Sequence, residues 1–302
     1  MALAVPSRAL AERQRPAWKS MGARGAGELL AAAERIDPLP VSVTRLALLV
    51  ADPEADIREI VEVITYDQAL AANLLRQVNS AALGGRVAIT TVRDAVMRLG
   101  IGTLFTLALG ASVRTAMGQA IPEFGLAEGD LWRHSVASSL AADVLRARCT
   151  ATVPMEASTA ALLHDFGKLV LARHFGGAML TAVSSAAAND GVTEIEAETE
   201  VFGFDHAEAG AVVAGSWNLP MAVVDGIRDH HREAADLPTV SRVVALANLV
   251  ADDLFAEEPV TESWMRRRDL SAALGFDADR YPELVEHAGE QYAQLAARYG
   301  VN

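Results

Sequence analysis

Apolar residues recur at helical spacing along most of the chain. Ile57, Ile60 and Ile64 stand three and four residues apart, which places them on one face of a helix. The stretch 104–117 is apolar on nearly every side and predicts a buried central helix. No strand-like alternation of useful length and no internal repeat is present, so the pattern predicts an all-α fold. Further helices are predicted at 27–35, 68–78, 92–99, 131–146, 157–163, 179–188, 192–201, 240–254, 262–274 and 282–299.

Proline and glycine positions divide this helical pattern. Asp37-Pro38-Leu39-Pro40 is an extended stop, since each proline disfavours helix in the residue before it. A second break lies near Ile121-Pro122. We therefore expect a helical bundle in which an N-terminal helical subdomain packs on a second helical subdomain. The expected ranges are a disordered or partly helical tail at 1–35, the two subdomains at 36–121 and 122–255, and C-terminal helices at 256–302.

Composition narrows the classes of function. Apolar residues make up 51% of the 302 residues, which excludes a disordered chain. The net charge of −13 opposes direct binding to nucleic acid. The cluster Arg8 to Arg24 is interpreted as part of the tail, and Arg266-Arg267-Arg268 as a solvated helix face. The acidic pairs Asp252-Asp253 and Glu257-Glu258 are also interpreted as solvated.

Cysteine content and hydropathy bear on the compartment. Cys149 is the single cysteine, so no intrachain disulfide forms and a cytoplasmic location is expected. Nothing near Cys149 marks an activated thiolate, and its segment is interpreted as a helix end. No apolar run approaches the roughly 18 residues of a membrane span, and no signal peptide is expected.

Polar residues that bind metals lie on the predicted inward helix faces. His134 shares a face with Ala137 and Ala141, and Asn248 shares one with Val244. A single histidine on such a face is usually a core residue bonded to a carbonyl. Because a buried polar group without partners costs about 1–3 kcal/mol, several of them together point instead to one shared polar site.

The pair His164-Asp165 carries the clearest chemical signal. Gly167 lets the chain turn after it, and Lys168 follows His164 by one helical turn. Imidazole and carboxylate ligands suit Fe, Zn, Ni or Mn, and a neighbouring ammonium suits a phosphate.

At these segments the chain resembles the HDOD domain, a bacterial signalling relative of the HD-superfamily metal-dependent phosphohydrolases. The resemblance spans roughly residues 37–252, with its motifs at 66–80, 95–100, 132–134, 162–168, 202–210, 217–220, 230–231 and 247–249. It implies an HD-like fold for the second subdomain. It also implies metal ligands at His134, His164, Asp165 and position 248, additional ligands at His206, His230 and His231, and a phosphate contact at Lys168.

Two departures bear on activity. Position 248 is asparagine where the related enzymes have aspartate, and no Gly-Tyr-Pro motif follows the histidine pair. The favoured interpretation is a non-catalytic regulatory module that acts on signalling proteins in trans, with a divalent metal or a nucleotide as its potential ligands. The alternative is a phosphohydrolase or phosphodiesterase acting on nucleotides or cyclic dinucleotides, with Lys168 in the catalytic machinery. The groove between the two subdomains is the predicted partner or ligand surface.

Three further predictions concern residues outside this set. Asn79-Ser80 is interpreted as a helix C-terminal cap and turn. Trp132 and Trp217 are interpreted as core anchors, and His174 and His287 as surface residues outside the site.

Overall fold

The computed structural model describes residues 23–50, 52, 54–79, 88–189, 192–234, 237–256 and 264–299. These residues form helices joined by short turns, and the β-type pairing within them is one isolated bridge between Ile121 and Leu126. The predicted all-α helical bundle is therefore confirmed. Residues 1–22 of the predicted tail, Ser80 and Glu257-Glu258 lie outside the described residues, so the predictions made for them stay predictions, whereas the helix predicted at 27–35 falls on α2 (Ala23–Ala33).

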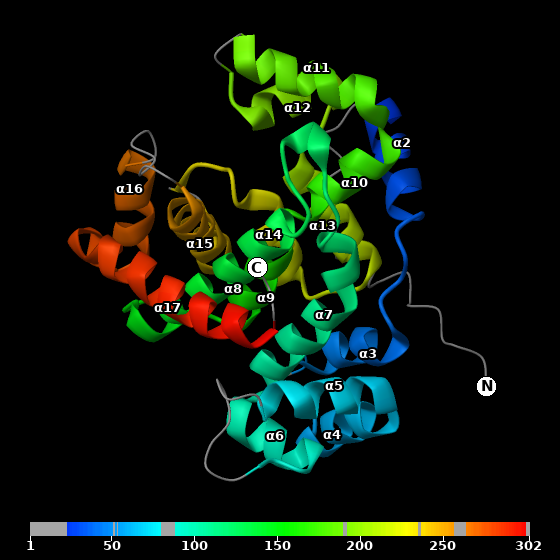
Figure 1. The fold of residues 1–302 in the computed structure, drawn as a ribbon, viewed down its shortest axis with the longest axis vertical. Coiled ribbons are helices and arrows are strands. Elements are labelled where there is room, and N and C mark those ends of the chain that lie inside the picture. The colour runs from blue at the N-terminus through cyan, green and yellow to red at the C-terminus, as the bar shows by residue number, and fades with distance from the viewer. Residues whose placement is uncertain are drawn as a thin grey trace.

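Helices α3 (Val41–Val50), α4 (Ile57–Tyr66), α5 (Gln68–Val78) and α6 (Val92–Leu99) form a layer at the bottom of Figure 1, which the long apolar helix α7 (Ile101–Met117) joins. Helix α2 (Ala23–Ala33) lies apart from this layer and packs on α13 (His206–Ser216) and α10 (Phe166–His174). Helix α7 packs against α3, α5, α6 and α9, so it links this layer to the rest of the molecule. The apolar run predicted at 104–117 is thus a central helix, with Leu104, Leu109 and Met117 at most 1% exposed.

The second group of helices surrounds α8 and α15. The bounds are η2 (Pro122–Phe124), α8 (Asp130–Arg148), α9 (Glu156–Leu163), α10 (Phe166–His174), α11 (Gly176–Asn189), α12 (Glu194–Phe202), α13 (His206–Ser216), α14 (Met221–Asp229) and α15 (Thr239–Phe255). Helix α8 packs against α15 and α9, while α10 packs on α13 and α14 on α15. The predicted boundary near residue 121 falls in the turn between α7 and α8.

The C-terminal helices close one side of the bundle. They are α16 (Trp264–Leu274), η5 (Ala278–Arg280) and α17 (Tyr281–Tyr299). Helix α17 lies along α8 and α15, and α16 lies on α15, as the orange and red segments of Figure 1 show.

Side chains cap several helices. The Asp67 carboxylate accepts the N–H of Leu70 at the start of α5, and Asp205 accepts the N–H of Glu208 in α13. At the end of α5, the Asn79 amide exchanges two hydrogen bonds with the backbone of Ile89. Asn79 therefore caps α5 as predicted and also ties α5 to the chain that leads into α6.

Across the described part of the chain, no single helix is both long and apolar enough to cross a bilayer. Helices α6 and α7 together have the length and apolar composition of a membrane-spanning segment, but a bend of 114° separates the two.

Candidate metal centre

The predicted ligands converge because six helices deliver them to one point. His134 and Asn248 project from α8 and α15, two helices that pack against each other. The remaining ligands lie at helix ends, with His164 at the end of α9 and Asp165 at the start of α10. His206 is the first residue of α13, and His230-His231 follow the last residue of α14.

One half of the cluster consists of two imidazoles and an amide. The Nε2 atoms of His134 and His164 are 3.2 Å apart, and the Oδ1 atom of Asn248 lies 2.8 Å and 3.0 Å from them. Asp165 Oδ2 lies 3.7 Å from His134 Nε2 and 3.6 Å from His164 Nε2. Asn248 thus stands where a fourth ligand of this half would stand. We call this group the amide half.

The other half consists of three imidazoles. Asp165 Oδ1 lies 3.1 Å from His206 Nε2 and 3.8 Å from His230 Nε2. The Nε2 atoms of His206 and His231 are 3.1 Å apart. Asp165 and the three histidines each present one ligand atom within 4.8 Å of the others. We call this group the histidine half, and Asp165 belongs to both halves.

Hydrogen bonds behind the rings fix which nitrogen faces the centre. His164 Nδ1 donates to the carbonyl of Ala161 at 2.8 Å, and His230 Nδ1 donates to the carbonyl of Ile227 at 2.6 Å. Burial lowers the pKa of His164, and it holds that of His230 well below its usual value, so both rings are neutral near pH 7. A neutral ring whose Nδ1 carries the proton leaves a lone pair on Nε2.

This arrangement fits a bound metal ion. His230 Nε2 is buried and has no hydrogen-bond partner among the described residues, and the nearest carboxylate oxygen, on Asp165, cannot donate a proton to it. A cation between a ring nitrogen lone pair and an ionised carboxylate satisfies both acceptors at once. Nitrogen and oxygen donors in this ratio suit Zn, Fe, Ni or Mn.

Charge at the centre is set by Asp165 and its neighbours. Burial alone raises the pKa of Asp165, but Lys168, His164 and His206 outweigh burial and hold that pKa well below its usual value. Lys168 Nζ lies 3.2 Å from Asp165 Oδ2 and 3.5 Å from Glu194 Oε2. Burial lowers the pKa of Lys168, yet these carboxylates and Glu198 raise it overall, so the ammonium stays charged.

Glu198, which the sequence analysis missed, lies behind His206. Its carboxylate accepts from His206 Nδ1 at 2.8 Å and from the His206 backbone N–H at 2.7 Å, and both side chains are fully buried. Burial lowers the pKa of His206, but Glu198 and Asp165 raise it to about 10. A carboxylate behind a metal-ligating imidazole orients the ring and increases its basicity. The spacing of eight residues between 198 and 206 spans two helices and a turn, so no single-helix pattern could reveal it.

The two residues of the acidic pair predicted to be solvated differ. Asp252 keeps 44% of its side chain exposed, as predicted, but its Oδ1 atom also lies 3.6 Å from His134 Nδ1, one helical turn after Asn248 on α15. Desolvation on the inner side, with a contribution from Asp165, raises the pKa of Asp252 to about 6. For Asp253 the prediction is wrong, because Arg267 at 2.7 Å and the Tyr281 hydroxyl at 2.8 Å bind its carboxylate.

The arginine run at 266–268 is a second correction. The Arg266 guanidinium donates to the carbonyls of His230 and His231 at 2.5 Å and 3.0 Å, so it fixes the backbone of the histidine pair. Arg267 forms a buried ion pair with Asp253. Only Arg268, with 52% of its side chain exposed, matches the predicted solvated face. The physical reason is that α16 packs on α15, which turns two of the three arginines inward.

The predictions for the tryptophans, for the two histidines outside the cluster and for Cys149 are confirmed to different extents. Trp217 is 6% exposed and contacts Phe166, as a core anchor does, whereas Trp132 is half-buried on α8. His174 and His287 lie outside the cluster, although both are half-buried. Burial raises the pKa of the Cys149 thiol to about 11, so the thiol is not activated.

The fold and the cluster define an all-helical protein with a centre of histidines and one shared aspartate. The family model of the HDOD domain matches residues 36–233 of the 302, and the chain belongs to this family. Asn248 lies beyond the matched range, and the packing of α15 on α8 brings it to the centre.

Solved structures share the fold. A candidate phosphohydrolase from Shewanella amazonensis is 27% identical, with a TM-score of 0.68 over 89% of this chain and 98% of that one. An HDOD domain protein of unknown function from Geobacter sulfurreducens is 24% identical, with a TM-score of 0.69 over 89% and 98%. A candidate signal transduction protein from Marinobacter aquaeolei is 24% identical, with a TM-score of 0.70 over 92% and 66%.

A curated relative comes from Treponema pallidum. This uncharacterized protein is 26% identical over 234 residues, which is 75% of this chain. The chain spans 45% of the length of that relative.

Proposed function

We propose that this chain is a regulatory module that holds one divalent metal in its histidine half and does not hydrolyse phosphodiesters efficiently. As a member of the HDOD family, the chain would act in signalling by contacting separate protein partners. A solved structure of the same fold is named a candidate signal transduction protein, in agreement with this role.

Asn248 is the observation that carries the proposal. Its amide oxygen occupies the ligand position between His134 Nε2 and His164 Nε2, at 2.8 Å and 3.0 Å. An amide has the shape of a carboxylate but no charge, so it neither neutralises a divalent ion nor accepts a proton from a water molecule. Asp165 is then the one carboxylate in the two histidine-rich ligand groups, and Lys168 already neutralises part of its charge.

The histidine half keeps a full ligand set. Three imidazoles and Asp165 supply four donor atoms, and Glu198 and the carbonyl of Ile227 hold two of the rings in place. A bound divalent metal supplies Lewis-acid polarisation of a phosphoryl oxygen. Hydrolysis also needs a carboxylate that positions water on the opposite side of the centre, which Asn248 cannot provide.

The test is metal content and turnover in wild type and in Asn248→Asp. We expect about one metal per wild-type chain by plasma mass spectrometry, with no measurable cleavage of bis(p-nitrophenyl) phosphate. The variant restores a carboxylate to the amide half, so a second metal and measurable turnover are expected. Asn73→Asp, which adds the same charge on α5, is the matched control and should leave both readouts unchanged. Robust turnover by the wild type contradicts the proposal.

Lys168 supports the second candidate, a phosphohydrolase acting on a nucleotide. Its ammonium lies beside Asp165 and keeps 16% of its side chain exposed, which places a cation within reach of a bound phosphate. Glu194 competes for the same ammonium at 3.5 Å. Wild-type cleavage of a phosphodiester that Lys168→Met abolishes, with metal content unchanged, would establish this candidate instead.

A further inference from the structure

A large cavity lies away from the metal centre. It has a volume of about 960 Å³ and lies between the N-terminal helices and the second group of helices. Helices α5 and α7 form one wall, α8 and α9 form the other, and α17 contributes Gln291, Gln294 and Leu295 to the rim. None of the candidate metal ligands lines it. We call this cavity the interhelical groove, and its position agrees with the groove predicted between the two subdomains.

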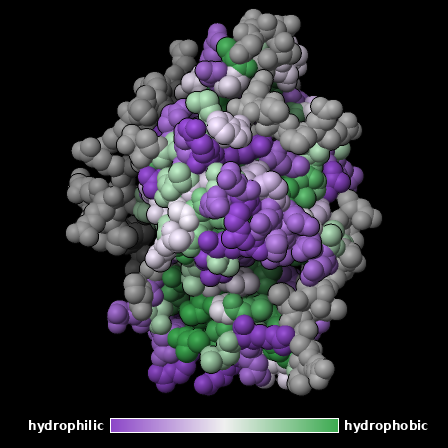
Figure 2. Space-filling model, turned by 90° about the vertical axis from the view of Figure 1, so that its left-hand side faces the viewer, coloured by the Kyte–Doolittle hydropathy of each residue, from purple (hydrophilic) through white to green (hydrophobic). Residues whose placement is uncertain are grey.

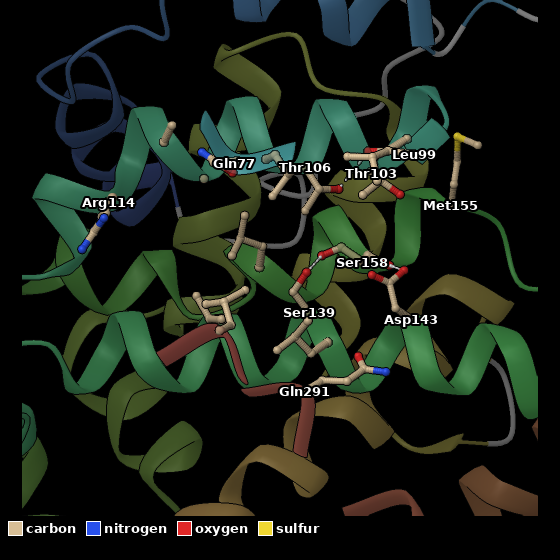
Figure 3. Close-up of a pocket in the computed structure, with 18 of the residues that line it drawn as sticks. Gln77, Leu99, Thr103, Thr106, Arg114, Ser139, Asp143, Met155, Ser158 and Gln291 are labelled. Carbon is tan, nitrogen blue, oxygen red and sulfur yellow. Dashed lines mark hydrogen bonds between the residues drawn. The ribbon is translucent and has the colours of Figure 1, made fainter. Parts of the chain in front are cut away.

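The groove combines an apolar interior with polar groups. Apolar side chains from four helices form much of its lining, among them Leu107, Trp132, Leu140, Leu162 and Leu295. Figure 3 shows Thr103 and Thr106 on the α7 wall across from Ser139 and Ser158, with Arg114 at one end and Met155 at the other. In Figure 2 green apolar residues gather in a recess in the lower part of the molecule, the part that α5, α6 and α7 occupy in Figure 1.

Cations outnumber anions around this groove. Its lining includes Arg76, Arg114 and Arg146 against the single carboxylate of Asp143. Asp143 accepts from Arg146 at 3.1 Å and from the Ser158 hydroxyl at 2.7 Å, so its charge is already engaged. Arg76 contacts the neutral amide of Asn73, and Arg114 has no ion pair within the described ranges.

Among the described residues, Arg76 and Arg114 are thus exposed guanidiniums at the groove with no carboxylate partner, so both can bind an anion that enters it. Such groups form short, strong hydrogen bonds with phosphate or carboxylate oxygens. We propose that the interhelical groove binds a small amphipathic organic anion, with an apolar or aromatic body in the cavity and an anionic head at Arg76 and Arg114. The site is separate from the metal centre and does not depend on the function proposed for it.

The size of the groove favours a small molecule over a protein segment or a nucleic acid. Ligand pockets for small molecules span about 300–1,000 Å³, and this groove falls in that range. An acyl carboxylate and a nucleotide both have the required combination of a flat or apolar body and an acidic head.

The test is titration of the full chain with 8-anilinonaphthalene-1-sulfonate, an aromatic anion whose fluorescence rises in an apolar site. We expect saturable binding of one probe per chain. Arg76→Gln with Arg114→Gln should weaken binding at least tenfold, which corresponds to about 1.4 kcal/mol, because both cations that attract the anionic head are removed. Thr103→Trp should abolish binding by filling the groove. Arg45→Gln, an exposed arginine on α3 outside the groove, is the matched control for charge.

Competition then identifies the class of ligand. Displacement of the probe by laurate assigns an acyl body, and displacement by GMP assigns a nucleobase. His230→Ala should leave probe binding unchanged, which separates this site from the metal centre. The proposal is overturned by binding that does not saturate, by equal binding in the double arginine variant and in Arg45→Gln, or by failure of both competitors. The double variant changes exposed side chains only, so it keeps the test valid if Thr103→Trp does not fold.

Discussion

The two halves of the metal centre have matching outer partners and different inner ligands. In each half a backbone carbonyl holds one histidine, Ala161 for His164 and Ile227 for His230. In each half a carboxylate also faces the outer nitrogen of a second histidine, Asp252 at 3.6 Å from His134 and Glu198 at 2.8 Å from His206. The inner ligands differ, because the amide half has Asn248 where the histidine half has a third imidazole.

The difference at residue 248 concerns the charge of the side chain and not the packing of the helices around it. Asparagine keeps the volume and the hydrogen-bonding oxygen of aspartate, so α15 and α8 pack as closely as a ligated centre requires. What is lost is one negative charge beside two imidazole lone pairs. Under the proposed function, the amide half keeps the shape of a metal site although it binds metal weakly, so shape alone does not report activity.

The variant with the largest expected effect breaks both halves at once. A Cβ on Gly167 would lie 1.8 Å from the carbonyl oxygen of His206, so α10 and α13 would have to separate and carry Asp165 away from His206. We expect Gly167→Ala to destabilise the chain by about 3 kcal/mol or more and to eliminate bound metal. Urea denaturation and plasma mass spectrometry measure the two effects.

Gly177→Ala is the control for this substitution. Nothing lies within 4 Å of a Cβ at Gly177, which also lies in a helix, α11. A gain of up to about 1 kcal/mol is expected, because alanine loses less backbone entropy than glycine on folding. Equal stabilities of the two variants would show that the contact between α10 and α13 does not hold the centre together.

The second prediction compares the halves directly. His230→Ala removes a ligand from the histidine half and should reduce metal content from about one per chain to near zero. His134→Ala removes a ligand from the amide half and should leave metal content within about twofold of wild type, since the histidine half keeps its four donors. Both variants replace one histidine with alanine, and they differ only in which half of the centre loses a ligand. Equal losses would mean that both halves bind the metal jointly.

The fold was predictable because local pattern and tertiary packing agree along this chain. The apolar run at 104–117 and the helix at 68–78 appear in the structure where helical spacing predicts them. The seven predicted ligand positions also converge, since each lies on an inward face or at a helix end. The HDOD family was recognised from the motifs around these positions.

What the sequence could not reveal depends on contacts between helices that are distant in the chain. Arg266 binds the backbone carbonyls of His230 and His231, which lie 36 and 35 residues away in the chain. Every residue has a backbone carbonyl, so the sequence does not show which ones Arg266 binds. Asp253 belongs to an acidic pair that is typical of a solvated face, but Arg267 of α16 and Tyr281 of α17 cover its carboxylate. From the sequence alone, a charged residue is predicted to be exposed. The contrary can be seen only when the position of the helix that covers it is known.

Glu198 allows a finer test of the histidine half. Glu198→Gln keeps the shape of the side chain but removes the charge that orients His206. Loss of such a partner costs about 10–100-fold in metal affinity, so the same loss is expected here by competition with a fluorescent chelator. Glu200→Gln, on the exposed face of the same helix, is the control. An unchanged affinity in Glu198→Gln would indicate that His206 is not a ligand of the bound metal.

Arg266 supports the same half from its backbone side, and its removal should have the smallest effect. Arg266→Ala leaves the carbonyls of His230 and His231 without their donor, at a cost of about 1–3 kcal/mol in folding free energy. Arg268→Ala, two residues away on the same helix and exposed, should cost under about 0.5 kcal/mol. If Arg266 holds the histidine pair in place, its variant also loses metal more readily at a fixed chelator concentration, while Arg268→Ala does not. Destabilisation by Arg266→Ala without any change in metal retention would confine its role to the packing of α16 on the bundle, and the geometry of the histidine half would then depend on Glu198 and the carbonyl of Ile227 alone.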